Sequence, residues 1–333
     1  MENKKIDTDP DTNMTATELF SQRSKTATVI VTYNPPAGFL KHFEKVFKEF
    51  NFIILIDNGT CAEKQDILIE LKQQYGKKIT MIMNNENLGI ATALNQGFRW
   101  AIENGYDYIF TLDQDSTPTP GFMDTLLKCE QTHPNRENLA TLGSLVTEDV
   151  MPTVCRYMRR RNHFLYEHAV ADRGLLRNVS NIITSGSLYN LNIWKKLGPF
   201  RDDFFIDYVD TEYNLRAIQN GYETSVQCDA RLIHNLGNRQ EKKLLWKTTY
   251  PTFHSPIRWY YICRNRVVML KLYALKQPYY LLYETVITIK AFIRVFSLEN
   301  QRRKKFLALV YGTYDGLRNK MNKIPTKIEK MLS

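Results

Sequence analysis

Two aspartates separated by one residue are the strongest candidates for chemistry in this sequence. Asp113-Gln114-Asp115 follows an apolar run and precedes Ser116-Thr117-Pro118. Two carboxylates this close can share one cation, and hard divalent ions bind carboxylate oxygens together with substrate phosphates. The pattern predicts a metal site for a phosphorylated substrate, and a solvated turn in which an aspartate caps the chain is the alternative.

Two further polar segments could bind parts of the same ligand. Asp57 ends another apolar run, and its carboxylate could accept a hydrogen bond from the N3–H of a uracil or thymine base. Asn87-Leu88-Gly89 opens an expected helix, where Gly89 permits close backbone approach and the helix N-terminus favours an anion. A plain helix cap is the alternative for this second segment.

The elements that must position these segments follow from the apolar pattern. Four short apolar runs predict strands, at residues 27–31, 52–56, 79–83 and 108–112. Helices are expected between them, over residues 39–50, 62–75 and 90–104. Such alternation favours an α/β fold with a parallel sheet, whose ligands bind outside the carboxyl ends of the strands. The four strands end there in polar residues, namely Asn34, Asp57, Asn84 and Asp113.

The rest of the chain is less regular. Residues 1–24 are polar and predict a disordered tail or a weak helix over Thr15–Ser21. A strand is expected over Ile182–Leu188 and a helix over Asp210–Asn220. From about Trp246 the sequence is aromatic and predicts helices.

The order of the motifs resembles the family 2 glycosyltransferases. The resemblance covers about residues 26–265 and rests on four segments, Val31–Pro35, Asp57–Gly59, Asn87–Gly89 with Ala93 and Asn95, and Asp113–Asp115. The spelling Asp-Gln-Asp-Ser is typical of the bacterial rhamnosyltransferases of O-antigen and related polysaccharides. The resemblance implies a GT-A fold (Rossmann-like, mostly parallel), a nucleotide-diphospho-sugar donor, and Mg²⁺ or Mn²⁺ as cofactor.

The resemblance also implies roles for individual residues. It assigns the base and ribose pocket to Thr32, Tyr33 and Asn34, with Asp57 on the base. It places Asn87 and Gly89 beside the nucleotide. It places Asp113 at the ribose and the metal, and Asp115 on the metal. Some relatives contact the metal or diphosphate through a histidine that matches His234, which otherwise reads as a structural residue near a strand end.

A carboxylate is needed for the transfer step. Inversion at a sugar carbon requires a base that takes the proton of the attacking hydroxyl, while a metal can stabilise the departing diphosphate. Residues 207–212 hold three carboxylates, and the family position of the base matches Asp210. Asp207 is its main competitor and is otherwise assigned to the sugar pocket. A simple helix cap at Asp210 is the structural alternative.

Four more residues are assigned to the substrates. Ser185 and Gly186 resemble the family segment that faces the donor sugar and acceptor, and Trp194 is expected to shape the acceptor pocket. Arg258 or Arg264 could pair bidentately with a diphosphate, and Arg264 is assigned to the nucleotide sugar. The alternatives are a core strand, a turn and an aromatic helix that packs on the main domain.

The basic residues lie at the C-terminal end. Residues 236–333 hold 20 Lys/Arg and 5 Asp/Glu, a net charge of +15, whereas residues 1–235 hold 25 and 30, a net charge of −5. A basic region of this kind indicates an anionic partner. We expect a catalytic domain over residues 25–245, with a nucleotide-sugar half (25–116) and an acceptor half (117–245), and a helical membrane-associating region over residues 246–333.

The segment Tyr279–Leu298 predicts an interfacial helix. Its apolar side would hold Leu281, Leu282, Ile289, Phe292, Ile293 and Phe296. Its polar side would hold Glu284, Thr288, Lys290, Arg294 and Ser297. The basic run Arg302–Lys305 follows, and such clusters bind anionic leaflets. A helix docked on the protein core is the alternative, and charges recur too often for a spanning helix.

These observations together predict an inverting rhamnosyltransferase. It would move L-rhamnose from dTDP-L-rhamnose to a lipid-linked glycan, peripherally on the cytoplasmic face of the cell membrane. The polar N-terminus predicts no signal peptide, and the five scattered cysteines predict reduced thiols. A transferase of another UDP- or dTDP-sugar is the alternative. A nucleic-acid-binding module is disfavoured, because acidic strand ends repel phosphate unless a metal intervenes.

Overall fold

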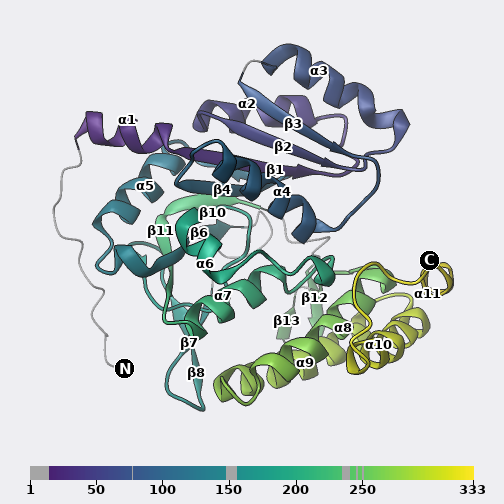
Figure 1. The fold of residues 1–333 in the computed structure, drawn as a ribbon. Coiled ribbons are helices and arrows are strands. Elements are labelled where there is room, and N and C mark those ends of the chain that lie inside the picture. The colour runs from purple at the N-terminus through teal and green to yellow at the C-terminus, as the bar shows by residue number, and fades with distance from the viewer. Residues whose placement is uncertain (1–14, 77, 148–155, 235–240, 245–246, 250) are drawn as a thin grey trace.

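A nine-stranded mixed sheet with helices on both faces forms the centre of the molecule (Figure 1). The computed structural model describes residues 15–76, 78–147, 156–234, 241–244, 247–249 and 251–333. Cys155, Trp246 and residues 1–14 lie outside these ranges. Within them the strand order of the large sheet is β3-β2-β1-β4-β10-β6-β11-β5, and β9 pairs with β11.

The first four long strands are parallel, as the alternating pattern predicts. They are β1 (Thr26–Thr32), β2 (Ile53–Asn58), β3 (Ile79–Asn84) and β4 (Tyr108–Asp113). The connecting helices are α2 (Phe39–Glu49), α3 (Gln65–Tyr75, after a 3₁₀ turn over Ala62–Lys64) and α4 (Ile90–Glu103). In the register of the sheet, β1 lies between β2 and β4, with Thr32 opposite Asp57 and Val31 opposite Asp113. The predicted polar strand ends therefore meet at one edge.

The second half of the sheet is mixed, because β10 and the two short strands run against the direction of the others. Its strands are β5 (Thr117–Pro118), β6 (Leu139–Thr147), β9 (Leu175–Leu176), β10 (Ser187–Asn190) and β11 (Glu223–Ile233). β10 is antiparallel to both β4 and β6, whereas β6 and β11 are parallel. The expected strand over Ile182–Leu188 is wrong in its start, because Gly186 has a φ of 76° and belongs to a turn before Ser187.

The remaining elements of this half lie around the sheet. The helices are α5 (Phe122–Thr132), α6 (Leu191–Leu197) and α7 (Val209–Gln219). Two separate hairpins pair β7 (Arg156–Arg160) with β8 (Tyr166–Val170) and β12 (Lys242–Leu244) with β13 (Lys247–Thr249). The expectation that helices begin near residue 246 is therefore wrong, since strands flank that position.

Side chains that alternate along each strand build the two core layers. Val29 and Ile54 point into the layer that contains α4 and α7, whereas Ile30 and Leu55 point into the layer of α2, α3 and α5. This period of two is the rule for extended chain. The sheet is consequently covered on both faces, and its carboxyl edge is left for the site.

The C-terminal helices pack together at one end of the molecule (Figure 1). They are α8 (Pro256–Tyr273), α9 (Pro278–Leu298), α10 (Arg302–Leu317) and α11 (Thr326–Leu332). Ser255 caps α8 and Pro256 occupies its first turn, a combination typical of helix starts. Met269, Tyr273 and Tyr280 belong to the same apolar cluster as β1. The C-terminal helices thus share a core with the sheet.

The N-terminal segment begins with a capped helix. Thr15 and Glu18 form a reciprocal capping box, and α1 runs over Ala16–Ser24, three residues beyond the expected weak helix. Gln22 is buried and donates to Glu130 on α5 at 2.6 Å. Residues 15–24 are consequently anchored to the domain.

Candidate metal and transfer site

Asp113, Asp115 and His234 converge at the carboxyl edge of the sheet. The loop that follows Asp113 returns through β5, in which Thr117 lies opposite Ile233 of β11. This short pairing brings His234, the residue after β11, beside the loop. His234 Nδ1 lies 3.3 Å from Asp115 Oδ1, and its Nε2 lies 3.6 Å from Asp113 Oδ2. One ligand atom from each residue lies within 4.8 Å of the other two.

The chemistry of these three groups fits a divalent cation. Carboxylate oxygens suit Mg²⁺ and Mn²⁺, and an imidazole nitrogen can complete the set. The side chains of Asp113 and Asp115 are 39% and 58% exposed, whereas His234 is 7% exposed, so the carboxylates open toward solvent. Ser116 Oγ lies 2.9 Å from His234 Nδ1 and holds the ring in place.

Burial and the neighbouring His234 shift the pKa values of Asp113 and Asp115 in opposite directions. Burial raises the pKa of Asp113, and the nearby His234 only partly opposes that shift. Burial also acts to raise the pKa of Asp115, but the hydrogen bond and charge of His234 outweigh it and lower that pKa. The two aspartates are therefore unequal, and a bound cation would favour the ionised form of both.

Ser185 and Gly186 support this loop from behind. Asp113 N donates to Ser185 Oγ at 3.0 Å, and Ser185 Oγ lies 2.6 Å from Ser116 Oγ. Ser185 is 2% exposed, and a Cβ at Gly186 would lie 2.5 Å from Ser144 Oγ. Ser185 is thus buried beneath the aspartates and supports their loop, and a contact of Ser185 or Gly186 with the donor sugar stays a prediction.

The first loop holds the expected nucleotide residues around Asp57. Thr32 Oγ1 donates to Asp57 Oδ1 at 3.1 Å and Thr60 N to Asp57 Oδ2 at 3.0 Å, while the Thr60 hydroxyl also donates to Oδ1. Asp57 is 1% exposed. Its hydrogen bonds join the end of β1 at Thr32 to the loop after β2 at Thr60. Its contact with a base stays a prediction.

Tyr33 and Asn34 lie nearer to solvent. Tyr33 is 47% exposed, and its backbone exchanges two hydrogen bonds with the Gln114 side chain, at 3.0 and 3.2 Å. Asn34 Oδ1 accepts from Cys61 N at 2.9 Å. Gln114 thus joins the first loop to the aspartate loop. Sequence reasoning gave Gln114 no role, because an amide between two aspartates has no local signature.

Gly89 makes a close backbone contact with the loop before α7. A Cβ at Gly89 would lie 2.6 Å from the Phe205 carbonyl oxygen, which also accepts from Ile90 N at 2.7 Å. Asn87 Oδ1 accepts from Gly89 N at 2.9 Å and from Asn58 Nδ2 at 3.1 Å. These residues join the nucleotide half to the Phe205 loop, and their contact with a nucleotide stays a prediction.

Asp210 lies in the first turn of α7, after a loop of unusual backbone conformation. Phe205, Asp207 and Tyr208 have φ values of 66°, 64° and 64°, a region that non-glycine residues rarely adopt. Burial raises the pKa of Asp210 to about 6; the hydrogen bond from Thr211 N opposes that shift, and the charge of Asp207 adds to it. A carboxylate with this pKa is ionised at neutral pH and suited to general-base chemistry.

Arg258 places a positive charge beside the carboxylates of the site. Its Nη2 lies 3.0 Å and its Nε 3.2 Å from Asp207 Oδ1. Burial acts to lower the pKa of Arg258, but Asp207, Asp113 and Asp210 outweigh it and raise that pKa. The arginine and three carboxylates therefore form one interacting group of charges. Asp207 is already paired there, which favours Asp210 as the group available to take a proton.

Arg264 is not at the site. It is fully buried in α8, where its guanidinium donates to the Phe204 carbonyl at 2.8 Å and lies 4.9 Å from the ring centroid of Tyr261. Its assignment to the nucleotide sugar is wrong. Trp194 is also misassigned, because it is 5% exposed and packs 5.3 Å from Phe98 in the core.

Asn265 holds the loop that precedes Asp210. Its Nδ2 lies 3.0 Å from Phe204 O, 2.8 Å from Ile206 O and 3.0 Å from Asp207 O. Phe205 also stacks on Tyr261, with 5.1 Å between ring centroids. The helix α8 therefore clamps a strained loop whose positive φ values cost about 1–3 kcal/mol each. Sequence reasoning gave Asn265 no role and missed this clamp.

Asn265→Ala is expected to lower both kcat and the free energy of unfolding. Loss of the amide removes its hydrogen bonds to the Ile206 and Asp207 carbonyls, at a cost of about 1–3 kcal/mol, and lets Asp210 move. We expect kcat to fall about tenfold or more. Denaturant unfolding and steady-state kinetics measure the two effects, with Asn192→Ala on the exposed face of α6 as control. Unchanged kcat in Asn265→Ala would show that the clamp does not position the base.

Comparison with known proteins gives a consistent result. Residues 28–198, about half of the chain, match the profile of glycosyl transferase family 2. The dTDP-rhamnosyl transferase RfbF of Shigella flexneri is 29% identical over 73% of this chain and 79% of its own. TarS 1–349 of S. aureus superimposes with a TM-score of 0.54 at 13% identity, over 89% of this chain and 82% of its own.

The mannosyltransferase PcManGT of Pyrobaculum calidifontis, solved with GDP-Man and Mn²⁺, superimposes with a TM-score of 0.53 at 12% identity, over 96% of this chain and 92% of its own. At these identities the solved structures establish the fold, and the expected GT-A architecture is confirmed.

Proposed function

Because the chain belongs to glycosyl transferase family 2, we propose that it is an inverting rhamnosyltransferase that uses dTDP-L-rhamnose. The observation that carries the proposal is the meeting of a two-aspartate, one-histidine cluster with the separate carboxylate Asp210. The similarity to a dTDP-rhamnosyl transferase supports rhamnose as the donor sugar. The acceptor would be a lipid-linked glycan of O-antigen or a related cell-surface polysaccharide.

The residues divide the reaction between them. Asp113, Asp115 and His234 would hold Mg²⁺ or Mn²⁺, which supplies positive charge for the departing diphosphate. Asp210 takes the proton of the acceptor hydroxyl as its oxygen forms the new bond to the anomeric carbon. The bond from that carbon to the phosphate oxygen breaks, and its electron pair leaves with dTDP. Attack opposite to the leaving group inverts the sugar carbon.

Arg258 has the geometry to bind the donor diphosphate. Its side chain is 41% exposed, and its guanidinium pairs with Asp207 at 3.0 Å. A diphosphate offers the planar guanidinium a bidentate acceptor of higher charge. We propose that Asp207 keeps Arg258 aimed at the site before the donor arrives.

The pH dependence of transfer is expected to follow Asp210. The base acts in its ionised form, and its pKa is about 6, so kcat/KM for the donor should be flat above that pH. Below it, protonation removes the base and the rate should fall tenfold per pH unit. A profile from pH 4.5 to 8.5 at saturating metal measures this, and a flat profile down to pH 4.5 would contradict the assignment.

A donor screen tests the proposal. Nucleotide release would be measured with dTDP-L-rhamnose, dTDP-glucose, UDP-GlcNAc and GDP-mannose, each with Mg²⁺ or Mn²⁺ and a lipid-linked glycan extract. We expect acceptor-dependent turnover that is at least a hundredfold faster with dTDP-L-rhamnose. Preference for a UDP-sugar would support the alternative donor, and no turnover with any donor would overturn the proposal.

A lipid-linked acceptor requires the enzyme to work at a membrane surface. We propose that the protein is peripheral on the cytoplasmic face of the cell membrane. Among the residues that the structure describes, no helix is long and apolar enough to cross a bilayer.

A further inference from the structure

We propose that the outer faces of α9 and α10 form a docking surface for an anionic lipid bilayer, an inference that rests on the proposed lipid-linked acceptor. Each helix carries a ridge of apolar side chains that are exposed by 40–60%. The α9 ridge consists of Leu281, Leu282, Ile289 and Ile293, and the α10 ridge of Phe306, Val310, Tyr314 and Leu317. Contiguous exposed apolar surface of this kind marks an interaction site.

The two ridges meet and cannot turn inward. Phe296 and Phe306 lie 6.5 Å apart between ring centroids, which joins the ridges at the turn between the helices. The opposite face of α10 is pressed onto α8, because a Cβ at Gly312 would lie 2.4 Å from Tyr260 O and one at Gly316 would lie 2.6 Å from Arg264 O. This close packing fixes the rotation of α10 and leaves its apolar ridge toward solvent.

The acidic residues of these helices are withdrawn from the surface. Glu284 is paired with Arg266 at 2.8 Å, Glu299 with Lys305 at 2.5 Å, and Asp315 accepts from Tyr260 Oη at 2.7 Å. All three are 3% exposed. Glu284, which was expected on the polar side of α9, lies on the inner face and is buried there. The outer charges of α9 and α10 are consequently cationic.

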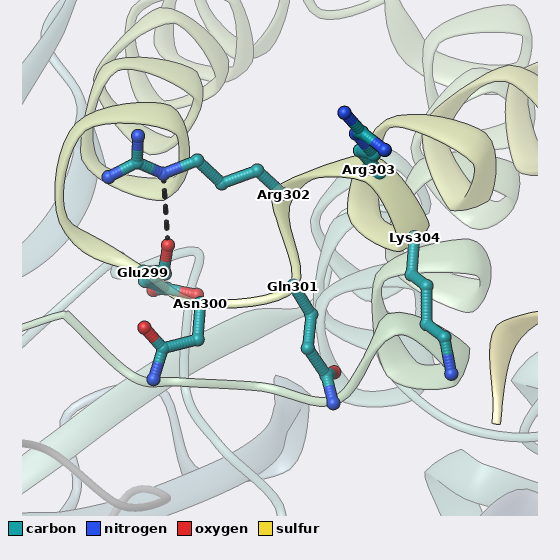
Figure 2. Close-up of a pocket in the computed structure, with 6 residues that line it drawn as sticks. All are labelled: Glu299, Asn300, Gln301, Arg302, Arg303 and Lys304. Carbon is teal, nitrogen blue, oxygen red and sulfur yellow. Dashed lines mark hydrogen bonds between the residues drawn. The ribbon is translucent and has the colours of Figure 1, made fainter.

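The turn between α9 and α10 carries Arg302, Arg303 and Lys304, which together are called the cationic rim (Figure 2). A shallow pocket of about 460 Å³ is lined there by residues 299–304. Arg302 donates to the carbonyls of Ser297 and Glu299, at 3.0 and 3.2 Å, and so caps the end of α9. Arg303 and Lys304 point away from that contact in Figure 2. Lys290 is exposed beside the α9 ridge.

A lipid surface fits this combination better than a protein copy does. A symmetric pairing of two chains through these ridges would bring the cationic rims together, and like charges repel. An anionic leaflet offers phosphates for the rim and acyl chains for the ridges, the arrangement of helices that lie in a membrane interface.

Vesicle sedimentation tests the surface with two double variants of the full chain. Ile289→Asn with Ile293→Asn removes apolar contact, and Arg303→Gln with Lys304→Gln removes charge without touching the buried Lys305 or the capping Arg302. Matched controls are Ile69→Asn with Phe164→Asn, which are 54% and 65% exposed, and Lys195→Gln with Lys196→Gln on α6. Vesicles of phosphatidylglycerol with phosphatidylcholine are compared with phosphatidylcholine alone.

We expect the wild-type protein and both controls to bind the anionic vesicles. The charge variant should bind about thirtyfold more weakly, because each basic residue contributes about fivefold near an anionic leaflet. The ridge variant should bind at least tenfold more weakly. Binding should weaken at 1 M salt, where screening acts within about 3 Å.

The outcomes separate this surface from the proposed function. Equal binding by the wild type and both test variants would overturn the docking surface, whatever the donor screen shows. A wild type that is dimeric by light scattering, with a monomeric ridge variant and no lipid preference, would show that a second copy covers the ridges. Nucleotide release without vesicles should be unchanged in both variants, so failure of the donor screen with intact lipid binding would overturn the function alone.

Discussion

Asp210→Asn is expected to lower kcat for transfer by about 10²–10⁴-fold while the donor still binds. The amide keeps the shape of the carboxylate and its acceptor for Thr211 N, which lies 2.6 Å from Asp210 Oδ1. It removes the basic oxygen that takes the acceptor proton. Steady-state nucleotide release measures kcat, and calorimetry with dTDP-L-rhamnose measures donor affinity.

Asp207→Asn is the informative comparison for this variant. Asp207 is held by Arg258 at 3.0 Å, so its loss should free the arginine and change KM for the donor more than kcat. An active Asp210→Asn enzyme together with an inactive Asp207→Asn enzyme would move the base to Asp207. The acid limb of the pH profile should also disappear in the residual activity of Asp210→Asn.

Asp115→Ala should abolish metal-dependent transfer. Its carboxylate is one of three groups whose ligand atoms lie within 4.8 Å, and the remaining aspartate and histidine leave a site with two ligands. The side chain is 58% exposed, so the fold should survive the change. Mn²⁺ binding, followed by electron paramagnetic resonance, should weaken at least a hundredfold, and nucleotide release should stay near background across a metal titration.

The matched control for Asp115→Ala is Asp66→Ala, which removes an exposed carboxylate from the first turn of α3. It should bind Mn²⁺ and turn over donor as the wild type does. Wild-type affinity for Mn²⁺ in Asp115→Ala would remove Asp115 from the metal site. A variant that binds metal normally but is inactive would indicate a role in donor placement instead.

Local chemistry was sufficient to predict the parallel half of the sheet and its polar edge. β-branched runs such as Val29–Val31 and Ile53–Ile56 have few other stable states, and the residue that ends each strand is read directly from the chain. Parallel pairing then brings Asp57 and Asp113 to the same edge without further information. The pairing of His234 with the aspartates was foreseen only through the family resemblance.

Helix faces were decided by packing. Arg258 and Arg264 are six residues apart, which turns them about 240° around a helix, and only the docking of α8 determines which one faces the carboxylates. Arg264 is fully buried and Arg258 reaches Asp207. In the same way, the sequence leaves open whether Ser185 and Trp194 line the site or are buried, and contacts decide it: Ser185 lies beneath Asp113 and Ser116, and Trp194 packs on Phe98 of α4.

For α9, too, the sequence determined the helix and packing decided which side is buried. Both of its sides carry apolar residues, with Tyr280, Ala291 and Val295 on one and Ile289 and Ile293 on the other. Its sequence therefore determined that it is a helix and that its surroundings are basic. Tertiary structure decided which side is buried, because Arg266 and Tyr208 offer Glu284 a buried ion pair and hydrogen bond that no solvent-facing side could supply. Burial of a charged side chain is stable only when ion-pair or hydrogen-bond partners surround it. For Glu284 these partners come from other elements of the fold.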